Sequence, residues 1–496
     1  MRRFQSIWIA GMLAFSICGA WAQDNSTAPP ASSAPQTQPE PVPAYGQENA
    51  PPPISDNPPL SGLDVPGLEP HAAPLSYLQP GATFSESVDS NVGDVPGESA
   101  VRSVSRALGS LTMQKLWSHY DLALDYVGGV AYYNPHGLGF KTLQQADVDQ
   151  KISWKRGQLS LRDSFSYLPE GNFGSAYGSL GSQGIESLGT TAFGSFWGGS
   201  SLGTLGLAPR ILNVSLADVS ENLTPKSAIT AAGGYAFTHF YGNDISTGGP
   251  FLGSSQVSAQ VGYNRQLSVH TQIALVYGYQ GFDFSVFGTA FHSHVIQAMY
   301  GHRLSGRMDF LIGAGPQFTH INTQTIFGPV GEQRLGVAGR ARLRYKFPKT
   351  SLDLAYERFL TSGSGFFAGA QTDLARLSVQ RPLNRVWSGF ADIGYSRNSR
   401  QQPLSATQLA TCDFDNSNPT LPPCPGVDAN SFTTGFAGLG VHRALGHDFH
   451  MFVSYQFNEL SFDHSYCGGV PVCSRISNRH VGTIGLDWTP RPIRID

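Results

Sequence analysis

Charged residues and long apolar runs are both scarce in this sequence of 496 residues. Asp, Glu, Lys and Arg make up 14% of the chain, whereas ordinary soluble domains carry about 25%. Beyond the N-terminal segment no apolar run is long enough for a transmembrane helix, and no P-loop or HExxH motif occurs. The formal net charge of −3 argues neither for nor against nucleic acid, and the export signal described below leaves a nucleic-acid partner with little support. Membrane-spanning helices are therefore excluded, whereas a membrane β-barrel, whose apolar residues are hidden in alternation, is not.

Cysteine is also scarce, with five residues in the whole sequence. Cys18 lies in the N-terminal segment, and the other four form two local pairs, Cys412/Cys424 and Cys467/Cys473. Each pair lies in one stretch rich in Pro, Gly, Asn and Asp, without a histidine at ligand spacing. Two local disulfides in an oxidising compartment are the favoured interpretation, and a metal site is the alternative.

The N-terminus has the pattern of an export signal. Met1-Arg2-Arg3 is basic, Ile7 to Gly19 is a short apolar run, and Ala20-Trp21-Ala22 precedes Gln23. This arrangement predicts a signal peptide over residues 1–22 that is cleaved after Ala22. Lipidation at Cys18 is disfavoured because Ile17 is too large for the residue before a lipidated cysteine.

Residues 23–80 are rich in Pro, Ala, Ser, Gln and Asn. Such a segment cannot bury enough apolar surface to offset its ordering entropy, so we predict a disordered periplasmic spacer. Binding to peptidoglycan or to another periplasmic partner is the sharper alternative.

The segment from Leu335 to Phe347 alternates strictly between two classes of side chain. Leu335, Val337 and Leu343 share one face, and Arg340, Arg342, Arg344 and Lys346 share the other. A period of two indicates a β-strand, because a helical period of 3.6 would scatter the arginines. The next segment, from Leu352 to Leu360, alternates in the same way and predicts an antiparallel hairpin.

Similar segments recur from Ser118 onward, and the connections between them alternate in length. Gln266–Ser268 and Leu445–His447 are short, whereas 168–208, 321–332 and 398–430 are long. Short turns at one end and long loops at the other are typical of an outer-membrane barrel. We predict an all-β, antiparallel up-and-down transmembrane β-barrel over residues 118–490. It has about 16 strands, or 18 if two weak segments within residues 81–117 count, and residues 491–496 form a short tail.

The signal peptide, the loop alternation and the final segment Val481–Trp488 resemble porin-like bacterial outer-membrane β-barrel proteins. The resemblance implies an outer-membrane location, membrane lipid as a partner, and insertion by the barrel-assembly machinery. One departure stands out, because such proteins usually end on an aromatic residue, whereas Trp488 is followed by Thr-Pro-Arg-Pro-Ile-Arg-Ile-Asp.

The candidate site is the wall of the lumen. The predicted pore-lining cations are Arg162, Arg340, Arg342, Arg344, Lys346 and Arg376. The predicted pore-lining carboxylates are Asp121, Asp125, Asp309, Asp353, Glu357 and Asp392. Separate basic and acidic walls would orient polar solutes, and a row of arginines favours anions. The alternative is that these charges pair across strands, for example Arg342 or Arg344 with Asp353 or Glu357.

These features predict a porin-like channel for passive diffusion of small polar solutes, with a preference for anions. An export conduit, for example for polysaccharide, and a closed surface or adhesion barrel are the alternatives. The long Gly-rich connection 168–208 either folds into the lumen or stays outside. The sequence predicts no cofactor and no enzyme activity, since Gly199-Ser200-Ser201-Leu202-Gly203 matches G-x-S-x-G without a strand–turn–helix context.

Overall fold

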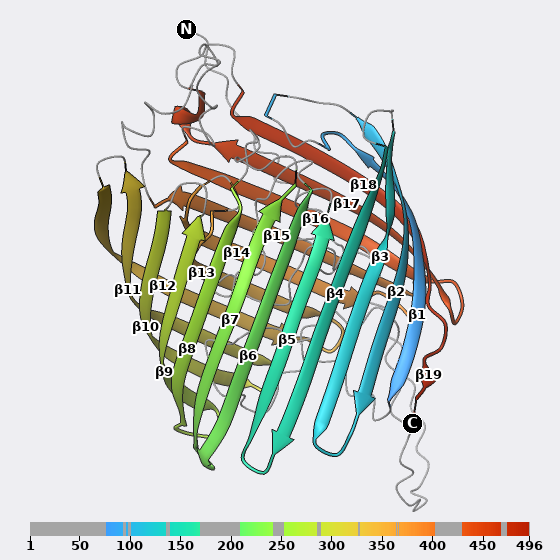
Figure 1. Cartoon of the computed structure of the whole chain (residues 1–496). Helices are drawn as coiled ribbons and strands as arrows, with labels where there is room; N and C mark the ends of the chain where they lie inside the picture. Colours follow the sequence, from blue (N-terminus) through green and yellow to red (C-terminus); the bar gives the residue numbers. More distant parts are fainter. Residues whose placement is uncertain are drawn as a thin grey trace, which may run out of the picture. The chain divides into compact units, whose positions relative to one another are not determined.

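Eighteen long antiparallel strands form one closed barrel in the computed structural model of the chain (Figure 1). The structure describes residues 76–92, 96–97, 101–134, 139–168, 209–241, 252–284, 289–325, 328–363, 365, 367–401, 429–467 and 474–495. The first nine strands are β1 Tyr77–Asp89, β2 Arg102–Leu116, β3 Tyr120–Asn134, β4 Gly139–Trp154, β5 Gly157–Leu168, β6 Arg210–Thr224, β7 Ser227–Phe240, β8 Ser254–Gln266 and β9 Thr271–Phe284. The next nine are β10 Thr289–Ser305, β11 Met308–Thr325, β12 Gly328–Lys346, β13 Ser351–Thr361, β14 Ala370–Pro382, β15 Trp387–Arg400, β16 Ser431–Ala444, β17 Phe449–Phe462 and β18 Ile476–Trp488.

The ring closes between its first and last long strands. β1 pairs with β2 on one side and with β18 on the other, in a register that runs from Ala82 opposite Trp488 to Asp89 opposite Val481. A two-residue strand, β19 (Ile493–Arg494), extends the pairing of β1 at Leu78 and Tyr77. Closure removes the unpaired strand edges that an open sheet would expose.

The predicted fold class is confirmed, with the larger of the two expected strand numbers. Both weak segments are full strands, and β1 already begins at Tyr77. The barrel therefore starts before Ser118, and the Pro-rich segment ends before Pro80. Their pattern was weak because Ser and Thr, such as Ser85 and Ser87, occupy the inner positions of β1 and give little contrast to their neighbours.

The two ends of the barrel differ as predicted. We call the end with the short connections, such as β4–β5 and β6–β7 at the bottom of Figure 1, the turn end, and the other the loop end. One expected loop is wrong: Ile321–Glu332 is mostly strand, since β11 continues to Thr325 and β12 begins at Gly328. Unbroken pairing of the two strands, down to Thr325 opposite Gly328, replaces the loop with a long hairpin.

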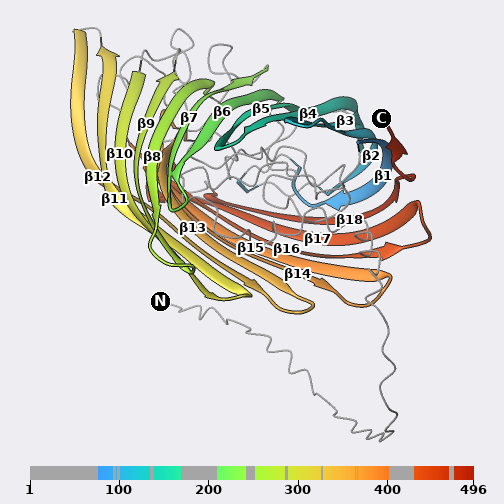
Figure 2. The ribbon, with the colours of Figure 1, turned by 90° about the horizontal axis from the view of Figure 1, so that it is seen from below.

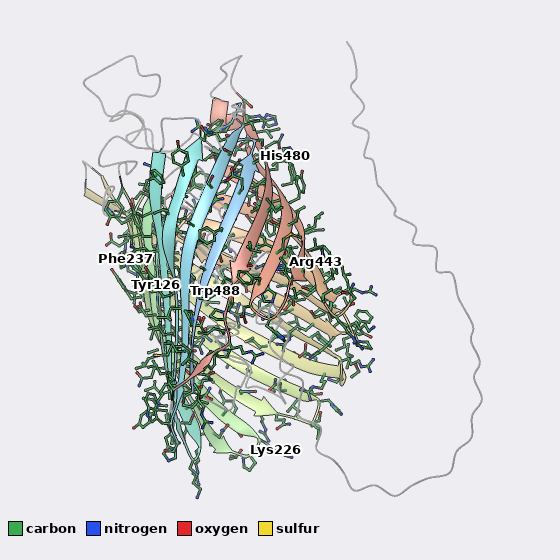
Figure 3. All side chains as sticks on the ribbon, turned by 90° about the vertical axis from the view of Figure 1, so that its right-hand side faces the viewer. Tyr126, Lys226, Phe237, Arg443, His480 and Trp488 are labelled. Carbon is green, nitrogen blue, oxygen red and sulfur yellow. The ribbon has the colours of Figure 1, made fainter. Side chains whose placement is uncertain are left out.

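Large apolar side chains are exposed over much of the outer surface of the barrel. On β12, for example, Leu335 is 73% exposed and Val337 is 56% exposed, whereas the inward Ala338 is fully buried. Outward aromatic residues such as Tyr126, Phe237 and Trp488 stand on the outside of the wall (Figure 3). An apolar outside and a polar inside are what a barrel in lipid requires. In the described ranges no helix is long and apolar enough to cross a membrane.

The sheet turns at β10 to β12 (Figure 2), and β10 and β11 approach closely there. Gly315 on β11 permits this approach, because a Cβ atom there would lie 1.7 Å from the carbonyl oxygen of Ile296 on β10. Past this bend, the inner face of β9 meets β13, as Gln280 Nε2 donates a hydrogen bond to the carbonyl oxygen of Leu360 at 3.3 Å.

Candidate functional site

All twelve predicted pore residues lie at inward positions of their strands, opposite in parity to the exposed apolar residues. They form two walls. The first, called the basic wall, contains Arg340, Arg342, Arg344, Lys346, Arg376, Asp309, Asp353, Glu357 and Asp392, from β11 to β15. The second, called the acidic wall, contains Asp121, Asp125 and Arg162, from β3 and β5, on the opposite side of the ring.

Two arginines of the basic wall are held by carboxylates in forked geometry. Arg342 donates from Nε and Nη2 to Asp353, at 3.1 and 2.7 Å. Arg344 donates from Nε and Nη2 to Asp309 on the neighbouring strand, at 3.1 and 2.8 Å. The expected pairing is thus found for Arg342 with Asp353, whereas Arg344 takes a partner that the sequence reasoning had not considered. Forked bonds fix the planes of the guanidinium groups, and both side chains remain partly exposed.

The other cations of the basic wall have different surroundings. The guanidinium carbon of Arg340 lies 5.0 Å from the ring centroid of Phe359, in cation–π geometry. Glu357 lies directly across from Arg340 in the strand register. Arg376 donates from Nε to both oxygens of the fully buried Asp392, at 3.1 and 3.0 Å.

Lys346 is exposed at the turn end. With Lys346 included, the basic wall holds five cations and four carboxylates, so that most of its positive charge is neutralised within the wall.

The acidic wall is larger than the sequence reasoning had found. Asp147, Asp149 and Asp218 also face inward and are 7%, 5% and 6% exposed. Arg162 lies among them, with Nη2 at 3.2 Å from Asp218 and Nε at 3.8 Å from Asp149. The alternation of Gln145, Asp147 and Asp149 along β4 was the signal that could have identified two of these carboxylates.

Two carboxylates of the acidic wall face one another. Asp125 lies directly opposite Asp147 in the register of β3 and β4. Asp125 accepts a hydrogen bond from the Thr112 hydroxyl at 2.6 Å, and Asp147 accepts one from Gln145 Nε2 at 2.8 Å. Like charges directly opposite in a sheet repel one another. Hydrogen bonds from Thr112 and Gln145 hold the two carboxyl groups at these facing positions.

Apolar side chains connect the two halves of the barrel interior. We call this cluster the apolar bridge; it contains Leu212, Val214, Leu216, Ala236, Val295, Ala338 and Phe359. These residues come from β6 and β7 on one side and from β10, β12 and β13 on the other. Because β8 and β9 contribute none of its members, the bridge spans the interior instead of following the wall. It narrows the lumen beside Arg340, which lies over Phe359.

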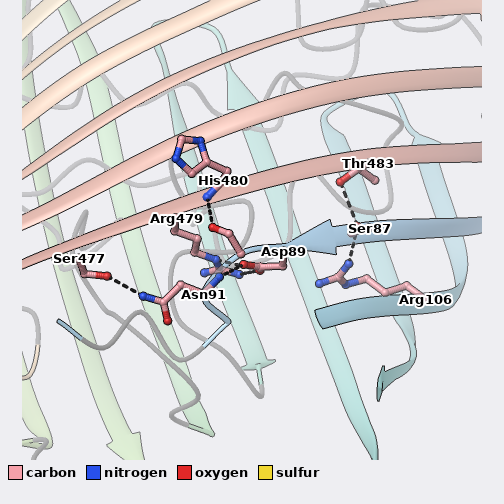
Figure 4. Close-up of polar contacts among 9 residues, drawn as sticks. Ser87, Asp89, Asn91, Arg106, Ser477, Arg479, His480 and Thr483 are labelled. Atoms are coloured by element: carbon pink, nitrogen blue, oxygen red, sulfur yellow. Dashed lines mark hydrogen bonds and ion pairs between the residues drawn. The ribbon is translucent and has the colours of Figure 1, made fainter. Parts of the chain in front are cut away.

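The seam between β1 and β18 carries a buried ion pair that the sequence reasoning missed (Figure 4). Arg479 donates from Nε and Nη2 to Asp89 Oδ2, at 2.9 and 2.6 Å, and both residues are 1% exposed. Ser87 lies 3.0 Å from the Thr483 hydroxyl and accepts a hydrogen bond from Arg106 Nη1 at 2.9 Å. These contacts join the first and last strands through side chains as well as backbone.

Several inward polar atoms have no hydrogen-bond partner among the described residues. They include Nε2 of Gln260 and Gln297, Oε1 of Gln317 and Oδ1 of Asn264. A buried polar group without a hydrogen bond costs about 1–3 kcal/mol. Water that bonds to these groups would remove that cost, and a polar lumen has the partners that ordered water requires.

Several predicted features fall outside the described part of the chain. The signal peptide, most of the Pro-rich segment, nearly all of the 168–208 connection, and Cys412, Cys424 and Cys473 lie there. The side chain of Cys467 lies outside it too, so both disulfides remain predictions. Among the described residues, no group of three or more His, Cys, Asp or Glu side chains has the geometry of a metal site.

Comparison with known proteins gives likeness in architecture only. No protein family and no curated protein matches the sequence. Three solved Pseudomonas aeruginosa structures are similar, each covering 84% of this chain: OccK9 (OpdG), OprD, and OccK2 (OpdF) in complex with glucuronate. Their identities are 10%, 9% and 7%, their TM-scores 0.40, 0.39 and 0.38, and the alignments cover 98%, 95% and 97% of those chains. The closed register of β1 to β18 carries the fold assignment, and it agrees with the resemblance to porin-like barrels that the sequence predicted.

Proposed function

We propose that this chain forms a channel in the bacterial outer membrane for passive diffusion of small polar solutes. The observation that carries the proposal is the contrast between the two faces of one closed sheet. Outward positions carry exposed apolar residues such as Leu335, and inward positions carry charged and amide side chains such as Arg342 and Gln297. An 18-stranded ring is wide enough for an aqueous lumen.

The arrangement of charged side chains in the lumen favours the passage of solutes that carry separated positive and negative charges. The basic wall has a surplus of one cation, and the acidic wall sets Asp121, Asp125, Asp147, Asp149 and Asp218 against Lys151 and Arg162. Opposed walls of opposite sign produce a field across the pore, which orients dipolar solutes. The preference for anions rests on the exposure of Arg342 and Arg344 to the lumen, since their side chains remain 20% and 19% exposed.

Single-channel conductance of the purified chain in a planar bilayer tests this function. We expect stable conductance steps in the wild type. Substitution of Arg340, Arg342 and Arg344 by serine should keep the conductance and shift the reversal potential in a salt gradient toward cation preference. Absence of any conductance from folded protein would overturn the channel proposal, and unchanged selectivity in the triple variant would overturn the anion preference alone.

A closed barrel is the second candidate, because the apolar bridge crosses the interior. Phe359 is 2% exposed and Val214 is fully buried within it. A hydrophobic constriction can block ions by excluding water. Folded wild-type protein that is silent in the bilayer, together with a conducting Phe359→Ala variant, would support this second function.

A further inference from the structure

The outer surface of β13, β14 and β15 changes in character over three successive rows. The first row, Leu354, Leu377 and Ile393, is aliphatic; the second, Tyr356, Ala375 and Tyr395, carries two tyrosines; the third is Arg358, Asp373 and Arg397. Leu354, Ile393, Tyr356 and Tyr395 are 43%, 55%, 39% and 51% exposed, which places these rows on the outside of the barrel. The third row is the nearest of the three to the loop end.

The charged third row is organised around Asp373. Arg358 Nη1 donates to Asp373 Oδ1 at 3.0 Å, and the Tyr356 hydroxyl donates to the same oxygen at 2.7 Å. The Arg358 side chain is nevertheless 43% exposed. Arg397 lies directly across from Asp373 on the other side and is exposed. Within the described residues it has no ion-pair partner, so the row carries one net positive charge that faces outward.

The order of the rows matches the layers of a membrane. Aliphatic side chains suit the hydrocarbon, and tyrosines mark the boundary with the headgroups. The arginines lie two residues farther along each strand, about 6–7 Å beyond the tyrosines, which places them at headgroup depth. Arg358 and Arg397 flank Asp373 and are separated by two strand spacings, about 10 Å, so that their side chains can converge on one anion that lies farther out than the Asp373 carboxylate.

We propose that Arg358 and Arg397 bind the phosphate group of a lipid in the outer leaflet, with Asp373 positioning Arg358. Guanidinium groups match phosphate oxygens in forked geometry, and the tyrosine row beneath would contact the start of the acyl chains. The proposal rests on the membrane placement in the proposed function, but it does not require the channel to conduct.

Native mass spectrometry of the full chain in detergent tests the site. Three probes are compared: a phosphorylated glycolipid, the same glycolipid after removal of its phosphates, and inorganic phosphate. The variants are Arg397→Gln, which breaks no contact within the described protein, and Arg358→Gln with Arg397→Gln. Arg443→Gln is the matched control, since Arg443 is also an outward arginine but lies at the turn end (Figure 3).

We expect the wild type and the Arg443→Gln control to retain the phosphorylated glycolipid, and the double variant to bind it about tenfold more weakly. Arg397→Gln should give an intermediate loss. Equal binding of the dephosphorylated lipid, unchanged binding by folded Arg397→Gln, or binding of inorganic phosphate alone would overturn the proposal. Conductance measured on the same variants separates the two proposals, because loss of lipid binding should leave the conductance unchanged.

Discussion

Arg344 on β12 pairs with Asp309 on β11, with 2.8 Å between Nη2 and Oδ2. Asp353, which also lies directly across from Arg344, is instead occupied by Arg342. Asp309 and Asp353 lie on the two strands that flank β12, and each of them binds one of the two arginines. The pairs leave no strong positive ladder, and the selectivity of the lumen depends on how firmly each carboxylate holds its arginine.

Asp309→Asn should make the lumen more selective for anions. The change removes one negative charge and frees the Arg344 guanidinium. A unit charge about 4 Å from a permeating ion in water contributes about 1 kcal/mol. We therefore expect the anion-to-cation permeability ratio to rise about fivefold, measured from the reversal potential in a salt gradient. Asp283→Asn, which alters an outward carboxylate on β9, is the control and should leave the ratio unchanged. An equal ratio in Asp309→Asn and wild type would contradict the prediction.

Breaking the pair between Arg479 and Asp89 should weaken the closure of the barrel. Removing one partner leaves a buried charge without compensation, at a cost of about 3–5 kcal/mol. We expect Asp89→Asn to lower the temperature at which the folded band is lost in heat-modifiable electrophoresis. Glu86→Gln, an outward and exposed carboxylate on the same strand, serves as the control. A folded band as heat-resistant in Asp89→Asn as in wild type would show that the backbone pairing of β1 and β18 suffices.

Gly315→Ala should disturb the bend at β10 to β12. The added Cβ atom would lie 1.7 Å from the Ile296 carbonyl oxygen, and the strands must separate to admit it. Overpacking costs about 1–3 kcal/mol or more. Gly336→Ala in the same bend is a matched control, because its nearest atom would be at 3.9 Å. Thermal unfolding followed by circular dichroism should show a lower midpoint for Gly315→Ala only. Equal midpoints would mean that the bend does not depend on this close approach.

Phe359→Ala should open the apolar bridge. Loss of a buried phenyl ring costs about 3–5 kcal/mol and leaves a cavity that joins the lumen. We expect single-channel conductance to increase while the barrel remains folded. Phe436→Ala removes a ring that is 5% exposed on β16 and lies outside the bridge. It should lower stability without the same gain in conductance. Equal conductance in wild type and Phe359→Ala would show that the bridge does not limit the path.

The sequence alone was sufficient to predict the barrel and the inward face. A period of two is a local property of the backbone, so the parity of Arg340, Arg342 and Arg344 followed directly from their spacing. Connection lengths could be counted along the chain in the same way. The prediction was uncertain where the two faces of a strand differ little in polarity. In β1, for example, the inward Ser85 and Ser87 resemble loop residues.

Contacts between strands were decided by tertiary structure. The partner of Arg344 depends on the register of two hairpins, and the pair of Asp89 with Arg479 joins residues from opposite ends of the chain. The apolar bridge brings Phe359 of β13 together with Leu212, Val214 and Leu216 of β6, which are far away in the sequence. Alternation along a strand determines which face a side chain lies on, but the strand register and the curvature of the sheet determine which residues it contacts. The sequence therefore determined a barrel with a charged lining, and only the closed fold decided which of those charges neutralise one another.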